Sequence, residues 1–206
     1  MEERDKELIA QAKDVFMQYG IKSVTMDDMS RHLGISKKTL YKSVKDKNDL
    51  VQKCLQFQCN GEIDAVAAIQ NKSLSAIDEM FEIGQFVSSQ LKGIHPSIHY
   101  DLEKYHIEVF LSIKKAHMKN MYECMLKNLK KGIKEGVYRK DLRADVITKI
   151  YIKKIDVIFD AEVFPPEEIS FEEVYATLFR YHIRGIANQK GIDYLEKKEK
   201  QRQKRA

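Results

Sequence analysis

Proline is scarce in this 206-residue chain, and its three prolines stand at positions 96, 165 and 166. Because proline removes a backbone N–H group and ends helices, its scarcity leaves long stretches free to form uninterrupted helices. Those stretches repeat apolar residues at helical spacing and show almost no alternation typical of strands. We therefore predict an all-α fold, with 43% hydrophobic residues to build its core.

Long apolar runs are also missing. No stretch reaches the roughly eighteen apolar residues that indicate a membrane-spanning helix. The first residues, MEERDKELIA, are charged where a secretion signal has an apolar core. We expect a cytoplasmic protein with no membrane partner.

Cysteine is rare as well, with residues only at 54, 59 and 124. An odd number without paired spacing argues against a disulfide framework. Cys54 and Cys59 would lie about 140° apart around one helix, so they could not share a metal there. We expect reduced thiols that serve as core or surface residues.

The nine glycines form neither a GxGxxG nor a Walker pattern, and no nucleophile with a base stands out. His95 and His99 could share a metal if Pro96 occupied the first turn of a helix, with Asp101 or Glu103 nearby, and His106 belongs to the same cluster. Histidines on a surface or lining a pocket are the commoner outcome of such spacing. We therefore expect no enzyme, no metal site and no cofactor.

The densest local signals lie between residues 25 and 50. Thr25, with Asp28 three residues later, predicts a capping box, so a helix should begin at Met26. Gly34 predicts the left-handed residue that ends this helix. The sequence thus predicts a short helix followed by a tight turn.

A second short helix should follow that turn at once. Ser36 is a good N-cap, and Leu40 and Val44 form an apolar pair four residues apart. Asp46 begins the next helix, which limits this one to about two turns. A helix so short is unstable alone and must pack on the helix before it. Residues 25–44 therefore predict a helix-turn-helix.

The outer face of the second short helix predicts a DNA contact. It carries basic, hydroxyl and aromatic groups without an acid before Asp46: Lys37, Lys38, Thr39, Tyr41, Lys42 and Ser43, with Lys45 and Lys47 just beyond. Such groups contact phosphates and base edges when a recognition helix enters the major groove. The alternative is a solvated lysine-rich surface, but the caps, the turn and the N-terminal position together favour DNA.

At this point the chain resembles a known family. The segments ELIAQAKDVFMQYG and SVTMDDMSRHLGISKKTLYKSVKDKNDLV are similar to the DNA-binding domain of the tetracycline-repressor (TetR) family, over roughly residues 5–55. The matching positions are Gly20, Thr25, Leu33-Gly34, Ser36, Thr39-Leu40-Tyr41 and Lys47.

The resemblance implies a role for each of these DNA-facing residues. Thr25 and Lys47 would contact phosphates, and Tyr41 would contact the backbone and thymine methyl groups. Three residues would face the groove: Lys37, Thr39 and Ser43. Two departures from the family pattern, Lys38 for a small glycine and Val44 for an aromatic residue, suggest an added backbone contact and a lighter inner packing. They leave the operator sequence open.

The remaining sequence predicts a larger helical domain. We place the DNA-binding domain at residues 1–55, a regulatory and dimerisation domain at 56–191, and a charged, frayed tail at 192–206. The boundary should lie inside a continuous helix. Long helices are predicted for residues 106–135 and 143–162, and Ser170 should begin another after the two prolines.

The last two of these helices are too apolar for a single partner, which suggests a second chain. The resemblance implies the same, namely a four-helix bundle across a two-fold axis, with candidate interface residues Ile150, Ile158, Leu178 and Gly185. It also implies a pocket for a small apolar or aromatic effector. Candidate lining residues are Phe81, Phe86, Phe110, Met118, Met121, Tyr122 and Met125, although core packing is the simpler reading for any one of them.

These observations together predict a sequence-specific DNA-binding transcriptional regulator. We expect a homodimeric repressor that binds a pseudo-palindromic operator in double-stranded DNA and leaves it when a small molecule binds. The net charge of +5 is only a supporting hint. The alternative is a protein of the same fold without a small-molecule input, responsive to another protein or architectural in its role.

Overall fold

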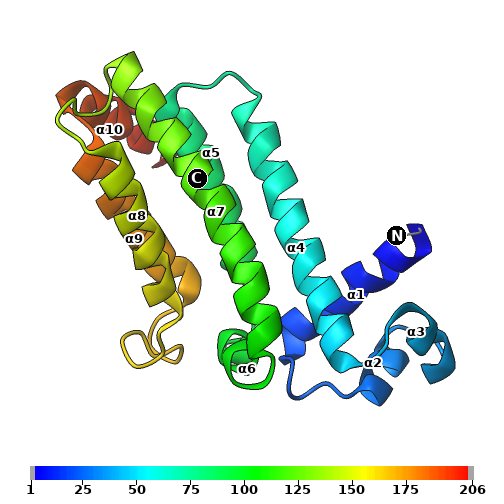
Figure 1. Cartoon of the computed structure of the whole chain (residues 1–206). Coiled ribbons are helices and arrows are strands. Elements are labelled where there is room, and N and C mark those ends of the chain that lie inside the picture. Colours follow the sequence, from blue (N-terminus) through cyan, green and yellow to red (C-terminus); the bar gives the residue numbers. More distant parts are fainter. Residues whose placement is uncertain (1–2, 204–206) are drawn as a thin grey trace. The chain divides into compact units, whose positions relative to one another are not determined.

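The computed structural model describes the backbone of residues 3–203 and the side chains of residues 3–198. Over this range the chain forms α-helices joined by turns and one short 3-10 helix, with a single isolated β-bridge between Tyr138 and Ala187 and no strand. Figure 1 shows this arrangement of helices. The predicted all-α fold is confirmed.

The helices follow one another with short connections. Their bounds are α1 Glu3–Tyr19, α2 Met26–His32, α3 Lys37–Ser43, α4 Lys47–Gln70, α5 Ala76–Leu91, α6 Ser97–Tyr105, α7 Ile107–Glu135, α8 Ala144–Asp156, the 3-10 helix η1 Val157–Phe159, α9 Phe171–Ile186 and α10 Gln189–Gln203. The chain divides into two compact units. The first is Met1–Ala65 with Gly93–His117, and the second is Val66–Lys92 with Met118–Ala206.

The first unit is built around the helix-turn-helix. Ile9, Ala12 and Phe16 of α1 are buried together with Leu40 of α3 and with residues of α2 and α4. These helices therefore share one apolar core. The same core buries two residues of α6, Ile98 and Leu102. This differs from the predicted division at residue 55, which assigned α6 to the second domain. Burial of apolar side chains, which the sequence order does not reveal, brings this distant segment in.

The second unit contains α5, α8, α9, α10 and the later part of α7. A buried polar network joins α5 to α7: the Asn128 amide donates to the Glu79 carboxylate at 2.9 Å, and Lys131 donates to the same carboxylate at 2.6 Å. The Tyr138 hydroxyl completes the network at Oδ1 of Asn128. Because each buried group has a partner, the network fixes these helices without leaving an unpaired charge.

One predicted helix end needs correction. The long helix α7 forms as predicted, but α8 stops at Asp156 rather than near residue 162, and the chain continues through η1. The Asp160 carboxylate then accepts the backbone N–H groups of Glu162 and Val163, which holds a turn in place of a further helical turn. Ser170 begins α9 as predicted, since its hydroxyl accepts the N–H of Glu173.

The charged segment 192–206 is not a frayed end where the structure describes it. It forms most of α10, in which Leu195 is only 3% exposed. The Tyr194 hydroxyl donates to Asp78 at 2.7 Å, and Lys198 forms an ion pair with the same carboxylate. These contacts attach α10 to α5. Residues 204–206 lie outside the described part of the chain.

Among the helices of residues 3–203, none is both long enough and apolar enough to cross a membrane.

Candidate DNA interface

The start of α2 is fixed by the predicted capping box. The Thr25 hydroxyl accepts the N–H of Asp28 at 3.1 Å and donates to the Asp28 carboxylate at 2.6 Å, while the Thr25 N–H donates to the same carboxylate at 3.1 Å. The hydrogen bond from the Thr25 hydroxyl is the main cause that lowers the pKa of Asp28. The carboxylate is therefore held ionised at the start of α2, where it satisfies orphan donors.

The turn and the recognition helix α3 also form as predicted. Gly34 has a φ of +64°, the left-handed conformation that glycine adopts without strain. Ser36 caps α3 by accepting the N–H of Thr39 at 3.0 Å. Leu40 is 0% exposed and Val44 is also buried, which fixes the rotation of α3 about its axis. The opposite face of this helix must therefore point to solvent.

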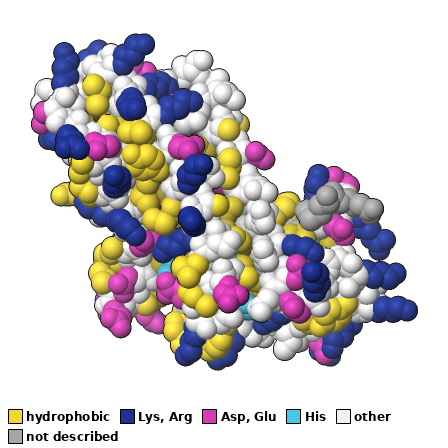
Figure 2. Space-filling view, viewed as in Figure 1, with side chains coloured by type: hydrophobic (Ala, Val, Ile, Leu, Met, Phe, Trp, Pro, Cys, Tyr) yellow, Lys and Arg dark blue, Asp and Glu magenta, His cyan; other side chains and the backbone are white. Residues whose placement is uncertain are grey.

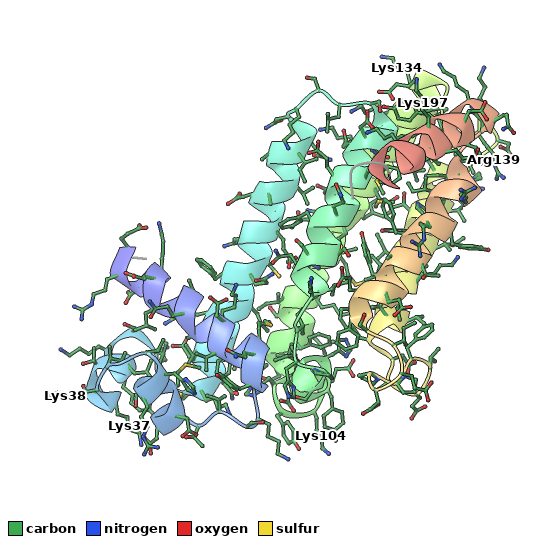
Figure 3. All side chains as sticks on the ribbon, turned by 180° about the vertical axis from the view of Figure 1, so that it is seen from behind. Lys37, Lys38, Lys104, Lys134, Arg139 and Lys197 are labelled. Carbon is green, nitrogen blue, oxygen red and sulfur yellow. The ribbon has the colours of Figure 1, made fainter. Side chains whose placement is uncertain are left out.

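That solvent face carries most of the predicted DNA-contacting groups. Lys38 and Lys42 are exposed, and Tyr41 is 43% exposed. Figure 3 shows Lys37 and Lys38 projecting from α3. Thr39 is half-buried, and its hydroxyl lies 2.8 Å from that of Ser36. The structure thus brings a hydroxyl, an aromatic ring and lysines together on one two-turn helix.

Lys37 has a partner that sequence reasoning missed. Its Nζ lies 2.6 Å from a carboxylate oxygen of Asp27 on α2, and hydrogen bonding to Asp27 raises the Lys37 pKa. Both side chains are about half exposed, so the pair is accessible to solvent and to ions. Figure 2 shows acidic side chains interspersed among the basic ones on this unit. DNA must compete with Asp27 for Lys37.

Ser43 departs from the expected groove-facing position. Its hydroxyl donates to the Asp5 carboxylate of α1 at 2.7 Å, and its carbonyl oxygen accepts a hydrogen bond from Lys53 of α4 at 2.7 Å. The side chain is therefore half-buried among the helices of its own unit. Ser43 thus links the end of α3 to α1 and α4, and its hydroxyl is not free to face the groove.

Lys47 and Thr25, the residues matched to phosphate contacts, are held differently. Thr25 is exposed, but its hydroxyl is engaged by Asp28. Lys47 is half-buried at the start of α4, its Nζ reaches the carbonyl oxygen of Lys22 at 3.4 Å, and burial lowers its pKa. Because an anion would compensate for this reduced solvation, the Lys47 ammonium is suited to a phosphate.

The candidate effector residues do not form one set. Phe110 belongs to the first unit, where its ring meets that of His99 edge to face, at 5.2 Å between centroids, and packs against the helix-turn-helix core. The other six residues belong to the second unit. Phe81 meets the ring of Phe179 at 5.7 Å, and Met125 is buried. The seven candidates are thus divided between the two units, with Phe110 in the first.

The candidate interface residues also differ from one another. Ile158 is 1% exposed and packs inside the second unit, so its side chain is not available to a second chain. Ile150 is 44% exposed, Leu178 is half-buried, and Gly185 is exposed. No atom lies within 4 Å of the place where a Cβ of Gly185 would stand. Three of the four candidates therefore remain accessible.

The histidines and cysteines have separate environments. His95 contacts Ser97, His99 lies 3.7 Å from Glu103, and His106 contacts Asn48. Within the described residues, no group of three His, Cys, Asp or Glu side chains is placed to hold a metal. The cysteines are unpaired thiols, and burial raises the pKa of Cys54 to about 12.

The chain is similar to known regulatory proteins. Residues 8–54 match the family described as "Bacterial regulatory proteins, tetR family". The HTH-type transcriptional regulator YvaF of Bacillus subtilis strain 168, an uncharacterised protein, is 24% identical over 191 residues, which cover 92% of this chain and 98% of that protein.

Solved structures share the fold at lower identity. A transcriptional regulator from Cytophaga hutchinsonii has a TM-score of 0.72 at 16% identity, covering 91% of this chain and 100% of that one. A TetR-family regulator from Agrobacterium tumefaciens has a TM-score of 0.72 at 14% identity, covering 90% and 98%.

The capped helix-turn-helix, its basic face and these similarities define a DNA-binding transcriptional regulator with an all-helical second part. Residues 8–54 form a DNA-binding domain of the TetR family. The relatives named above are described as transcriptional regulators.

The ion pair between Lys37 and Asp27 leads to a prediction. Asp27→Asn removes a negative charge from the DNA-facing side and frees Lys37, so duplex DNA should bind about 1.4-fold to 5-fold more tightly, as expected for an exposed pair of about 0.2–1 kcal/mol. Fluorescence anisotropy at fixed salt measures the change. Asp14→Asn is the control, because Asp14 also pairs with a lysine but lies on α1. Equal gains in both variants would contradict a specific role of Asp27.

Proposed function

We propose that this chain is a homodimeric repressor that binds a pseudo-palindromic operator through α3 and is released by a small molecule. The observation that carries the proposal is the orientation of α3. Its buried Leu40 faces the core, so Lys38, Tyr41 and Lys42 face outward together. An exposed two-turn helix with this chemistry suits the major groove.

Base reading and backbone contact should separate on this surface. Tyr41 and Thr39 offer a ring, a hydroxyl and a methyl group near the start of α3, and such groups distinguish base edges and thymine methyls. Lys47 offers only a charge, which any phosphate satisfies equally. Selection of bound fragments from the protein's own genome would identify the operator. Failure to enrich any fragment would contradict sequence-specific binding.

Three substitutions separate these two kinds of contact. Thr39→Ala and Tyr41→Ala should weaken binding to the selected operator by about 1–3 kcal/mol and leave binding to mixed-sequence duplex nearly unchanged. Lys47→Ala should weaken both and lower the salt slope by about 0.9 for each phosphate that the variant no longer neutralises. Anisotropy titrations over a salt series measure both quantities. Equal weakening on random DNA for all three would contradict base reading by α3.

The proposed dimer rests on the exposed apolar faces of α8 and α9. Val146, Ile150 and Val157 recur on the α8 side at spacings of four and seven residues and are all exposed. Tyr181 of α9 is 70% exposed, and Lys154 of α8 lies over its ring at 4.9 Å. The two faces are thus adjacent. A second copy would cover them across a two-fold axis and set two α3 helices about 34–36 Å apart.

The surface at Gly185 supports the same arrangement. Gly185 is the last residue but one of α9, and glycine has a lower helix propensity than alanine. The space beyond its Cα is empty within one chain, so it does not serve internal packing. Close approach of a helix from a second copy would account for a glycine at this position.

A charge placed in this face tests the dimer. Ile150→Glu should convert the dimer to a monomer in sedimentation experiments, because a carboxylate would lose its water at the interface. Operator affinity should fall in parallel, since one α3 would act alone. Val163→Glu is the matched control, because Val163 is 54% exposed but lies in the turn before α9. An unchanged mass for Ile150→Glu would contradict this interface.

The proposed effector site rests on the second unit. Phe81, Met121 and Tyr122 are half-buried there, and aromatic and methionine side chains adapt to varied apolar ligands. The second unit also contains a buried polar group, His182, that the sequence did not indicate. Nε2 of His182 is buried without a hydrogen-bond partner, and the His182 ring lies 4.3 Å from that of Tyr151.

The protonation of His182 narrows the class of effector. Burial, followed by the nearby Lys154 charge, lowers the His182 pKa to about 4, so the ring is neutral at physiological pH. An unmade hydrogen bond of a buried group costs about 1–3 kcal/mol. A neutral, mainly apolar or aromatic molecule with one hydroxyl or carbonyl group would meet this need.

A ligand screen tests release. The panel contains neutral phenols, aromatic ketones and fatty alcohols. Compounds that release the operator should also raise the thermal midpoint of unfolding, because a ligand concentration of one hundred times Kd stabilises the folded protein by about 2.7 kcal/mol. His182→Phe should weaken that shift while operator binding stays intact. An unchanged shift in His182→Phe would contradict the role of His182. If another protein, and none of these compounds, releases the operator, the alternative of a protein-responsive regulator is favoured.

A further inference from the structure

Lysines and tyrosines gather at the end of α6, in the first unit. Lys22 Nζ lies 4.9 Å from the centroid of the Tyr105 ring, and Lys104 Nζ lies 5.7 Å from the same centroid. Lys104 also donates to the Tyr100 hydroxyl at 2.5 Å and lies over the Tyr100 ring at 5.0 Å. We call these four residues the α6 cluster. They come from segments about eighty positions apart in the chain.

The α6 cluster holds two positive charges close together without a carboxylate between them. In the part of the chain that the structure describes, neither Lys22 nor Lys104 forms an ion pair. Asp101 is buried and accepts the backbone N–H of Lys22 at 2.9 Å and the Ser97 hydroxyl at 3.1 Å. Two like charges beside one ring repel each other, and a bound anion would relieve that repulsion.

Both lysines remain charged in this setting. The Tyr105 side chain, through a hydrogen bond, raises the pKa of Lys22, and the Tyr100 hydroxyl raises the pKa of Lys104. The rings also restrict the two long side chains. Because a lysine loses about 2 kcal/mol of rotamer entropy when it is fixed, prior restriction favours anion binding.

The cluster continues the surface on which DNA is proposed to lie. Lys22 stands three residues before Thr25, and its carbonyl oxygen accepts the hydrogen bond from Lys47. His106 directly follows Tyr105 and contacts Asn48, the residue after Lys47, at 2.5 Å. Figure 3 shows Lys37 and Lys104 at the same lower edge of this unit.

We propose that the α6 cluster is a second phosphate-binding site that holds the duplex backbone beyond the segment read by α3. Its ligand is a phosphodiester group of the DNA that α3 contacts, so the inference rests on the proposed function. Lys22 and Lys104 bind the phosphate oxygens, and the hydroxyls of Tyr100 and Tyr105 are available as further donors. The footprint on each half-site is then wider than the helix-turn-helix alone would give.

Salt dependence of binding measures the number of phosphates engaged. Lys22→Gln and Lys104→Gln should each weaken operator binding and lower the slope of log K against log salt by about 0.9 per phosphate left unneutralised, or about twice this for a dimer. The probe is the selected operator duplex with flanking base pairs on both sides. Lys115→Gln is the matched control, because Lys115 is an exposed lysine of the same unit that lies about 12 Å beyond the start of α7.

Phosphate ethylation interference locates the contact. In the wild-type complex, an ethylated phosphate outside each recognition half-site should block binding, and this interference should disappear in Lys104→Gln. In Lys47→Gln, interference should disappear at a different, inner phosphate. Thermal unfolding of each variant confirms that the fold is retained, as expected because Lys22 and Lys104 are exposed and Lys47 is only half-buried.

The outcomes separate this inference from the proposed function. If Lys47→Gln lowers the slope while Lys22→Gln and Lys104→Gln retain it, the α6 cluster does not bind phosphate, although α3 and α4 do. If Lys115→Gln lowers the slope as much, only the general charge of the unit matters, and the inference is wrong. If none of these variants changes the slope, the proposed DNA-binding face itself fails.

Discussion

Burial of Leu40 is the constraint on which the DNA-binding surface depends. Helix α3 has seven residues, fewer than an isolated helix needs in water. Its stability comes from the Ser36 cap and from a leucine that is 0% exposed in the core of the first unit. The same burial fixes the rotation of α3. The outward direction of Lys38 and Tyr41 is therefore a consequence of core packing and not of contacts that these side chains make.

That core also determines which segments border the DNA-binding surface. Ile98 and Leu102 attach α6 to the helix-turn-helix, and the contact between His106 and Asn48 brings the end of α6 to the start of α4. Lysines from three separate segments thereby share one side of the unit. A pair of apolar residues far along the chain thus contributes to an electrostatic surface without being charged.

Local chemistry explains which features were predictable from the sequence. The Thr25 capping box, the Gly34 turn and the Ser36 cap depend on residues within four positions of one another, so their pattern is visible in the chain itself. The bond from Ser43 to Asp5 spans 38 positions and was missed. The end of α8 was misplaced because no glycine or proline marks Asp156. Helix α10 was missed because Leu195 is a single apolar residue in a charged segment.

The partners of each lysine decide what DNA binding must displace. Lys37 gives up a carboxylate at 2.6 Å, whereas Lys104 gives up only a tyrosine hydroxyl and ring. Exchange of one anion for another gains little free energy, while adding an anion to an unbalanced pair of lysines gains more. Affinity for the backbone should therefore come mainly from lysines that lack acidic partners. The acidic residues near α3 then keep nonspecific attraction modest, so that base contacts from one short helix can still decide where the protein binds.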